Sequence, residues 1–291
     1  MKRLTIAALL LSASLTAFAK PVAIVNGEPI EKDLIDGQIQ TMRQQTKGQI
    51  KDTPQLRSNI LNHVIVHAVI VQEARRLKLD AKPEYRRIVN QALSDAHRIG
   101  EDKKPNFAKE YAVFRENLLE QAYRAYVLET NPVTDAQLRA EYQNLANYYK
   151  GSQEILIGQI ITRTPQDARN AINDLRRGVN FKQVASRYTV DPEGRKNGGV
   201  PTSYINLNDL QVAAPSLFNM VKSYKVGQFT QEPLQAGNVF AIFQVMDTRA
   251  ASVPSYKSVR ETLLAQLEDE RVNKAVDALV RRAKIQRMSA R

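Results

Sequence analysis

The chain has 291 residues, with 42 Lys and Arg against 30 Asp and Glu, so its formal net charge is +12, and it contains no cysteine. Disulfides, thiolate nucleophiles, iron–sulfur clusters and Cys-ligated zinc are therefore excluded, and stability must come from core burial. A hydrophobic fraction of 43% is typical of a globular protein, while 7% aromatic residues argue against a base-stacking nucleic-acid surface. The length suggests about two domains.

The first nineteen residues have the pattern of an export signal. Lys2 and Arg3 precede an apolar run, Leu4–Phe18, and the small-x-small pattern Ala17-Phe18-Ala19 follows. We predict a signal peptide over residues 1–19, cleaved after Ala19, and a mature protein that is soluble, periplasmic and without a membrane span. The alternative, an N-terminal anchor helix, is disfavoured because the run is shorter than the roughly 20 residues that span a bilayer. Export also disfavours nucleic acid as a partner.

Residues 20–150 are predicted to be mostly helical. The β-prone run Val22–Val25 meets a turn at Asn26-Gly27, after which Pro29 is expected to lead into a helix. Thr53-Pro54 has the pattern of a helix start, with Thr as N-cap and Pro at the first helical position. Further helices are expected over Glu84–His97, Phe107–Leu128 and Asp135–Tyr149, the last capped by Thr134.

The residue composition changes at residue 151. Glu154–Thr162 is rich in β-branched and aliphatic residues and is predicted to be a strand. The following elements are expected, in order, to be a helix after Thr164-Pro165 that ends at Gly178, a helix over Phe181–Tyr188, an irregular loop over Asp191–Gly199, a short helix over Ala214–Ser223 and a strand over Asn238–Met246. Residues 151–251 therefore read as an α+β module.

Residues 252–291 hold one long helical pattern, from Tyr256 to about Arg282. A single helix cannot bury an apolar stripe alone, so we expect this one to pack on the N-terminal helices. The predicted fold class is α+β: a mostly helical N-terminal domain, completed by the C-terminal helix, with the α+β module inserted in it.

The module resembles a known family. Its matching segments are Gly178–Pro192, Gly198-Gly199, Lys225–Pro233 and Gln244–Arg249, in this order. It is similar to the parvulin-type peptidyl-prolyl cis-trans isomerase domain (PpiC type). The helical parts resemble the chaperone domain of the exported SurA and PrsA proteins. The resemblance implies a periplasmic foldase of Gram-negative bacteria whose partners are unfolded exported polypeptides, outer-membrane proteins among them.

The resemblance also assigns the site position by position. The family's two histidines fall on Gln159 and Ala241, and its Cys-or-Asp position falls on Asp191. The Phe and the Met that form the proline slot fall on Leu217 and Ala213, with Met220 as a further apolar residue. Gln159 and Asp191 are thus the candidate catalytic residues. Gln159 can donate and accept hydrogen bonds but Ala241 cannot, so the paired-imidazole wall is missing.

Three alternatives stay open at this point. The substitutions at Gln159 and Ala241 equally fit a non-catalytic chaperone or peptide-binding protein. Asp191 fits a helix cap as well as a catalytic acid, and Gln159 fits a solvated strand residue. His63 and His67 have i, i+4 spacing but no third ligand in register, so we expect neither a metal nor any other cofactor. The sequence does not indicate an oligomeric state.

Overall fold

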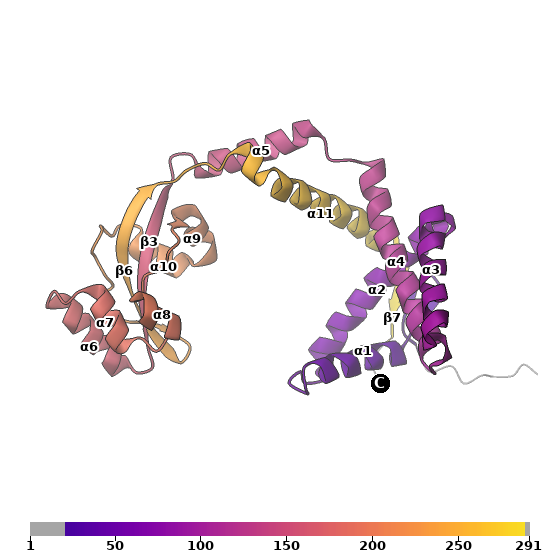
Figure 1. Cartoon of the computed structure of the whole chain (residues 1–291), viewed down its shortest axis with the longest axis horizontal. Helices are drawn as coiled ribbons and strands as arrows, with labels where there is room; N and C mark the ends of the chain where they lie inside the picture. Colours follow the sequence, from indigo (N-terminus) through magenta and orange to yellow (C-terminus); the bar gives the residue numbers. More distant parts are fainter. Residues whose placement is uncertain (1–20, 289–291) are drawn as a thin grey trace, which may run out of the picture. The chain divides into compact units, whose positions relative to one another are not determined.

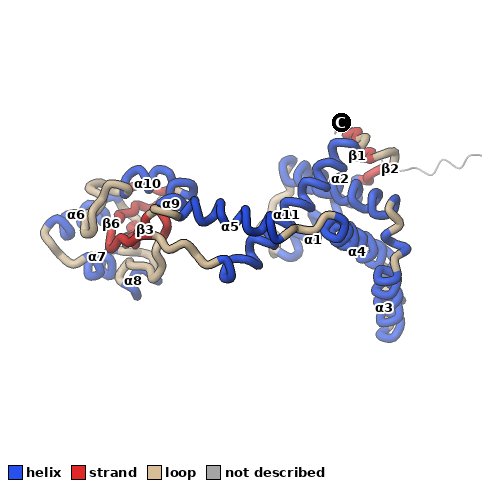
Figure 2. The backbone as a smooth tube through the Cα atoms, turned by 90° about the horizontal axis from the view of Figure 1, so that it is seen from above, coloured by secondary structure: helices blue, strands red, loops and turns tan. Residues whose placement is uncertain are grey.

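The computed structural model describes residues 21–288, so the predicted leader lies outside the described residues. The chain forms two compact units. Unit 1 comprises the described residues up to Val133 together with those from Gln266 onward, and unit 2 is Thr134–Ala265. Figure 2 shows that helices dominate both units and that unit 2 contains the larger sheet. The mixture of helices and sheets confirms the predicted α+β class. Within residues 21–288, no helix is long and apolar enough to cross a membrane.

Unit 1 is a set of helices joined to one small sheet (Figure 1). Its elements are β1 (Pro21–Val25), β2 (Glu28–Glu31), α1 (Lys32–Gln45), α2 (Pro54–Arg76), the 3-10 turn η1 (Leu79–Ala81), α3 (Pro83–Ile99), the 3-10 turn η2 (Glu101–Lys103), α4 (Phe107–Thr130) and β7 (Ile285–Arg287). The long helix α11 (Tyr256–Arg282) begins in unit 2 and ends in unit 1.

The chain forms a hairpin where the sequence suggested a helix after Pro29. Asn26 and Gly27 both have positive φ, 49° and 92°, which is the requirement of a tight two-residue hairpin turn. Pro29 therefore lies in β2, opposite Ile24, and α1 begins only at Lys32. Proline is tolerated there because β2 is an edge strand of the sheet β2-β1-β7, so its missing N–H leaves no ladder bond unmade.

The predicted helix starts are confirmed by their caps. The Thr53 hydroxyl accepts a hydrogen bond from the Leu56 N–H at 3.1 Å, with Pro54 at the first helical position of α2. Thr134 and Gln137 form a complete capping box at the start of α5 (Asp135–Tyr149). These caps satisfy backbone donors that the first turn of a helix leaves unpaired.

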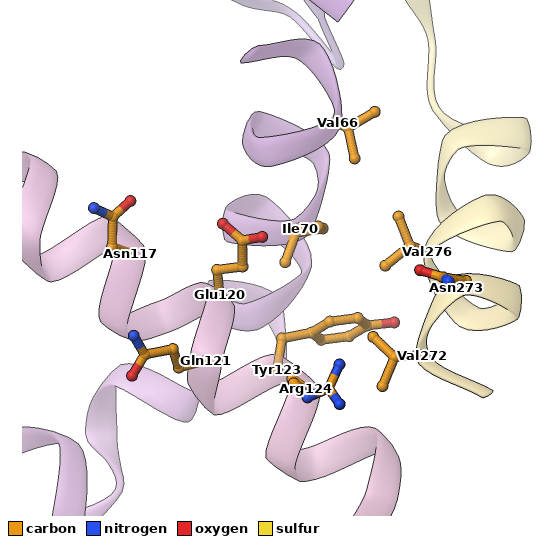
Figure 3. A pocket seen from close by; sticks show the side chains of 10 residues that line it. All are labelled: Val66, Ile70, Asn117, Glu120, Gln121, Tyr123, Arg124, Val272, Asn273 and Val276. Carbon is orange, nitrogen blue, oxygen red and sulfur yellow. The ribbon is translucent and has the colours of Figure 1, made fainter. Parts of the chain in front are cut away.

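The core of unit 1 gathers residues from distant parts of the sequence. Val69 on α2, Tyr123 on α4 and Leu279 on α11 belong to one buried cluster. Figure 3 shows the Tyr123 ring projecting from α4 toward Val272 and Val276 of α11. The last turns of α11 thus pack on the N-terminal helices, as its apolar stripe suggested. Burial of that stripe, at about 25 cal/mol per Å², is what fixes a C-terminal segment to helices more than a hundred residues earlier in the chain.

Unit 2 is built on a four-stranded antiparallel sheet in the order β4-β3-β6-β5. After α5, its elements are β3 (Gln153–Thr162), α6 (Pro165–Arg176), α7 (Phe181–Tyr188), α8 (Pro192–Asn197), β4 (Ile205–Asn206), α9 (Leu207–Ala213), α10 (Pro215–Val221), β5 (Leu234–Ala236) and β6 (Val239–Ala250). The first residues of α11 complete it.

The two central strands, β3 and β6, carry a core on each face. One face holds Ile160 and Ile242, which pack with residues of α6 and α7. The other face holds Ile157 and Val245, which pack with Leu210 of α9 and with residues of α10. Figure 1 shows the two helix pairs on opposite sides of these strands. Helices on both faces explain why β3 reads as a nearly continuous apolar run.

Two short helices of unit 2 differ from the sequence prediction. The segment after Asp191, expected to be an irregular loop, is helix α8, and the residues before Ala214 form α9. Both begin at a side-chain cap, Asp191 for α8 and Asn206 for α9. Each is at most seven residues long, so neither shows the apolar periodicity from which a helix is predicted.

Candidate functional site

The candidate site lies on the face of β3 and β6 that α9 and α10 cover. Side chains alternate between the faces of a strand, so Gln159 and Ile161 share the face of Ile157. On β6 the same alternation places Ala241 and Phe243 with Val245. Gln159 and Ala241, the two positions to which the resemblance assigns the histidines of parvulin domains, therefore point to the same side of the sheet. Gln159 is exposed, whereas Ala241 is buried, with 7% of its surface accessible.

The segment from Thr189 to Gly199 is hydrogen-bonded to the edge of β3 beside Gln159. The Gln159 N–H donates to the Gly199 carbonyl at 2.8 Å, and the Val190 N–H donates to the Ile161 carbonyl at 2.7 Å. The Ile161 N–H in turn donates to the Thr189 hydroxyl at 3.1 Å. These bonds bring the segment that carries Asp191 to the strand that carries Gln159. The two candidate residues are 32 positions apart in the sequence.

Gly199 is required for this close approach. Its φ is +72°, and a Cβ built on it would lie 2.4 Å from the Gln159 carbonyl oxygen and 2.8 Å from Ala185 Cβ. Any side chain would therefore separate the segment from β3. The Gly198-Gly199 pair carried part of the family resemblance, and each glycine permits a close approach: Gly199 to strand β3, and Gly198 to Lys182 of α7, whose Cβ would lie 2.6 Å from a Cβ added there.

Asp191 is the N-cap of α8. Its carboxylate accepts hydrogen bonds from the Gly194 N–H at 2.8 Å and from the Glu193 N–H at 3.3 Å. Both oxygens thus have a backbone partner, and the charge lies at the N-terminal end of a short helix. The capping alternative describes the observed contacts, and a catalytic role for Asp191 stays a prediction.

Apolar side chains from α10 and β6 form the remainder of the site. Leu217 and Met220 of α10 are partly buried in the same cluster as Phe218 and Phe243. Ala213, at the end of α9, is exposed and does not belong to that cluster. The structure therefore brings Leu217 and Met220 to the face that holds Gln159 and Ala241, and it leaves Ala213 at the margin.

A polar cluster lies toward the other end of the same two strands. The Tyr204 hydroxyl donates to the Asp247 carboxylate, which holds the pKa of Asp247 below its usual range. The Arg249 guanidinium lies 3.8 Å from the centre of the Tyr204 ring and donates to Glu154 at 2.6 Å. Each charge in this cluster has a partner within the unit, which is typical of a structural network.

Similarity to known proteins extends over the whole chain. A probable parvulin-type peptidyl-prolyl cis-trans isomerase of Bordetella pertussis is 28% identical over 287 residues, which cover 98% of this chain and 100% of that protein. The chain is homologous to parvulin-type peptidyl-prolyl isomerases. A parvulin-like isomerase of Rickettsia typhi is 25% identical over 174 residues, 60% of this chain and 61% of that one. These relatives support, by resemblance, an activity of the parvulin isomerase type. No family model matches the chain.

Solved structures of similar chains include a SurA-like chaperone of Campylobacter jejuni, from work on PEB4 and Cj1289, and the peptidylprolyl isomerase PrsA of Bacillus anthracis. The first is 14% identical, covers 93% of this chain and 99% of its own, and has a TM-score of 0.41. The second is 18% identical, covers 76% and 94%, and has a TM-score of 0.39.

One residue of this candidate face was not predicted from the sequence. Phe243 lies directly opposite Gln159 in the β3–β6 pairing and is partly buried among the apolar residues of the face. It could have been found from the sequence by fixing the register of the two strands, since residues that alternate with Ala241 share its face. If the register of β3 and β6 is not known, Phe243 cannot be distinguished from an ordinary aromatic residue of the core.

Proposed function

We propose that the protein is a peptidyl-prolyl isomerase and foldase that binds X-Pro segments of unfolded exported polypeptides and assists their folding. The observation that carries the proposal is homology to parvulin-type isomerases over 98% of the chain, aligned with the full length of the relative. The arrangement of Gln159, Leu217, Met220 and Phe243 on one face of β3, β6 and α10 supports it.

The candidate site contains both kinds of group that the reaction needs. An X-Pro bond isomerises over a barrier of about 18–20 kcal/mol that amide resonance creates, and no covalent bond is made or broken. A catalyst needs an apolar slot for the proline ring and a polar neighbour that favours the twisted amide over the planar one. Leu217, Met220 and Phe243 would provide the slot, and the exposed Gln159 amide would provide the polar neighbour.

The proposed location is the periplasm. The export signal predicted over residues 1–19 supports it, and unfolded exported chains, including outer-membrane proteins, are the partners that such a location supplies. We further propose that residues 151–251 form the isomerase domain, and that residues 20–150 with residues 252–291 form a chaperone domain. The packing of Val272 and Leu279 with the core of the N-terminal helices supports the second assignment.

A proline-peptide isomerisation assay on the purified protein tests the enzymatic proposal. The expected result is a rate constant for the cis-to-trans step that rises linearly with protein concentration. The variant Gln159→Ala should lower that slope, and Arg163→Ala, just beyond the end of β3, is a matched control that should not. A rate equal to the uncatalysed one at every concentration would overturn the proposal.

A second function, non-catalytic chaperoning, is favoured by one specific observation. Ala241 is buried and has no side chain that can donate or accept a hydrogen bond, at a position where the family carries histidine. On this alternative the protein suppresses aggregation of an unfolded outer-membrane protein without accelerating proline isomerisation. Measuring both properties on the same preparation separates the two functions.

A further inference from the structure

The backbone of Phe243 is held on its outer edge by one buried residue, Thr230. The Phe243 N–H donates to the Thr230 hydroxyl at 3.1 Å, and the Phe243 carbonyl accepts from the Thr230 N–H at 2.9 Å. Thr230 is 1% exposed, so water does not compete for either bond. The side chain and the main chain of a single residue therefore hold both polar groups of the Phe243 backbone.

Gln159 and Phe243 form a non-hydrogen-bonded pair of the antiparallel ladder. The Gln159 N–H donates to the Gly199 carbonyl and the Phe243 N–H donates to Thr230, so both N–H groups point away from the opposite strand. In such a pair the two side chains lie closer together than in a hydrogen-bonded pair, while the backbone bonds run outward. The relation between the Gln159 amide and the Phe243 ring therefore depends on the outer supports, the segment that carries Gly199 on one side and Thr230 on the other.

A hydroxyl is needed at position 230 because the neighbouring chain leaves the sheet there. Phe229 forms a bridge to β6 and pairing resumes only at Leu234, so residues 231–233 lie outside both pairings. In a regular ladder the Phe243 N–H would donate to the backbone carbonyl of the residue opposite, and here the Thr230 side chain supplies the acceptor instead. A buried N–H that loses its acceptor is costly, so this hydroxyl lets the Phe243 backbone keep its place.

We propose that Thr230 is a positioning residue of the isomerase site, which acts by holding Phe243 opposite Gln159. This inference rests on the proposed isomerase function and deepens it, because it explains how the geometry of the same site is maintained. Thr230 is buried and acts through Phe243, so it is not a catalytic residue. The segment Lys225–Pro233, which carried part of the family resemblance, thereby acquires a physical role at the candidate site.

The placement can be measured by NMR on the whole protein, without any enzymatic activity. In the wild type we expect an NOE between the Phe243 ring and the Gln159 side chain. Thr230→Val replaces the hydroxyl by a methyl group of similar size. It should weaken this NOE and speed hydrogen exchange of the Phe243 amide at least about tenfold, because the amide loses its acceptor. Absence of the NOE in the wild type, or equal exchange rates in the wild type and Thr230→Val, would overturn the proposal.

Two further variants control for a general loss of structure. Thr162 is also buried, at 0% exposure, and its hydroxyl donates to the Thr164 carbonyl at 3.0 Å. It lies on the face of β3 opposite to Gln159, so Thr162→Val should leave the exchange of the Phe243 amide unchanged. Thr230→Ser keeps a hydroxyl and should retain both the NOE and the slow exchange. This variant also serves if Thr230→Val does not fold, and loss of the NOE in folded Thr230→Ser would contradict the proposal.

The enzymatic consequence is measured with a short proline peptide. Thr230→Val should lower kcat/KM at least about tenfold, since small displacements of a site are costly in rate, whereas Thr230→Ser and Thr162→Val should retain it. In a Phe243→Leu background, Thr230→Val should cause no further loss, because Thr230 acts through Phe243. Additive losses in the double variant would overturn the positioning role. A wild type without catalysis would refute the proposed function instead, and the NOE and the amide exchange would still test the placement of Phe243.

Discussion

Gln159 and Phe243 lie directly opposite each other in the antiparallel pairing of β3 with β6. Side chains at directly opposed positions are about 4.5–5.5 Å apart at Cβ, so an amide and an aromatic ring are neighbours on the face that α10 covers. This pair sets a polar group beside an apolar wall. This is the combination that the proposed isomerase site would need to favour a twisted X-Pro amide.

The first prediction concerns Phe243 and uses Phe240 as its matched control. Both rings are partly buried and lie on β6, but on opposite faces: Phe243 with the α10 cluster and Phe240 with the α6–α7 cluster. Phe243→Leu and Phe240→Leu should each reduce stability by about 1 kcal/mol, since an aromatic ring is exchanged for a smaller side chain. Only Phe243→Leu should slow proline isomerisation. Equal rates in the two variants would remove Phe243 from the site.

The second prediction separates the two possible roles of Asp191. Asp191→Ala removes the cap of α8 and should lower the free energy of unfolding by about 1 kcal/mol. Asp191→Ser keeps a capping oxygen without the charge, so its stability should be within about 0.5 kcal/mol of the wild type. Urea unfolding measures both. If the carboxylate acts on the substrate, Asp191→Ser should slow isomerisation at nearly unchanged stability, whereas an unchanged rate would leave Asp191 as a cap alone.

Local signals allowed much of the fold to be predicted from the sequence. The caps at Thr53 and Thr134 act within three residues of themselves, and the helices that they begin were predicted at their observed starts. The apolar stripe of α11 correctly indicated a distant packing partner.

Features that depend on pairing between strands far apart in the sequence were not predicted. β7 exists because Ile285–Arg287 pairs with Ala23–Val25, more than 250 residues away, and its three residues carry no strand signal alone. The same holds for the candidate site. The family resemblance assigned Gln159 and Ala241, but only the register of β3 and β6 shows that Phe243 is the neighbour of Gln159.

The third prediction tests the close contact of Gly199 with β3. Gly199→Ala must place a Cβ at 2.4 Å from the Gln159 carbonyl oxygen and also strain the backbone at φ +72°. Gly178 is a matched control because its φ is +83° and a Cβ there meets nothing within 4 Å. Gly178→Ala should therefore cost only the conformational strain, about 1–2 kcal/mol.

Gly199→Ala should cost clearly more than Gly178→Ala in the free energy of unfolding, and it should also slow isomerisation, because it displaces the segment that is bonded to Gln159. Both quantities can be measured by urea unfolding and the proline-peptide assay. Equal destabilisation by the two substitutions would mean that the segment from Thr189 to Gly199 moves away from β3 at no further cost in the free energy of unfolding.

The fourth prediction is a pH dependence that arises from His67. This residue of α2 is hydrogen-bonded to Glu120 of α4 at 2.8 Å, and its other ring nitrogen lies 3.8 Å from Glu116, which also pairs with Arg75. Glu116 and, to a lesser extent, Glu120 raise the pKa of His67 above 6.5 although burial opposes them. In return, His67 and Arg75 hold the pKa of Glu116 below 4.5.

The direction of this pH dependence follows from the linkage between protonation and folding. A raised pKa of His67 means that its contribution to stability is complete below pH 6.5 and is lost as the pH rises through the raised value. A lowered pKa of Glu116 means that its contribution is complete above pH 4.5 and is lost as the pH falls through the lowered value. The α2–α4 contact should therefore be most stable between these two limits.

His67→Gln removes the charge, so the difference in unfolding free energy between wild type and variant should shrink as the pH is raised from about 6 to about 9. A difference that stays constant over this range would show that the imidazolium contributes nothing to the stability of unit 1.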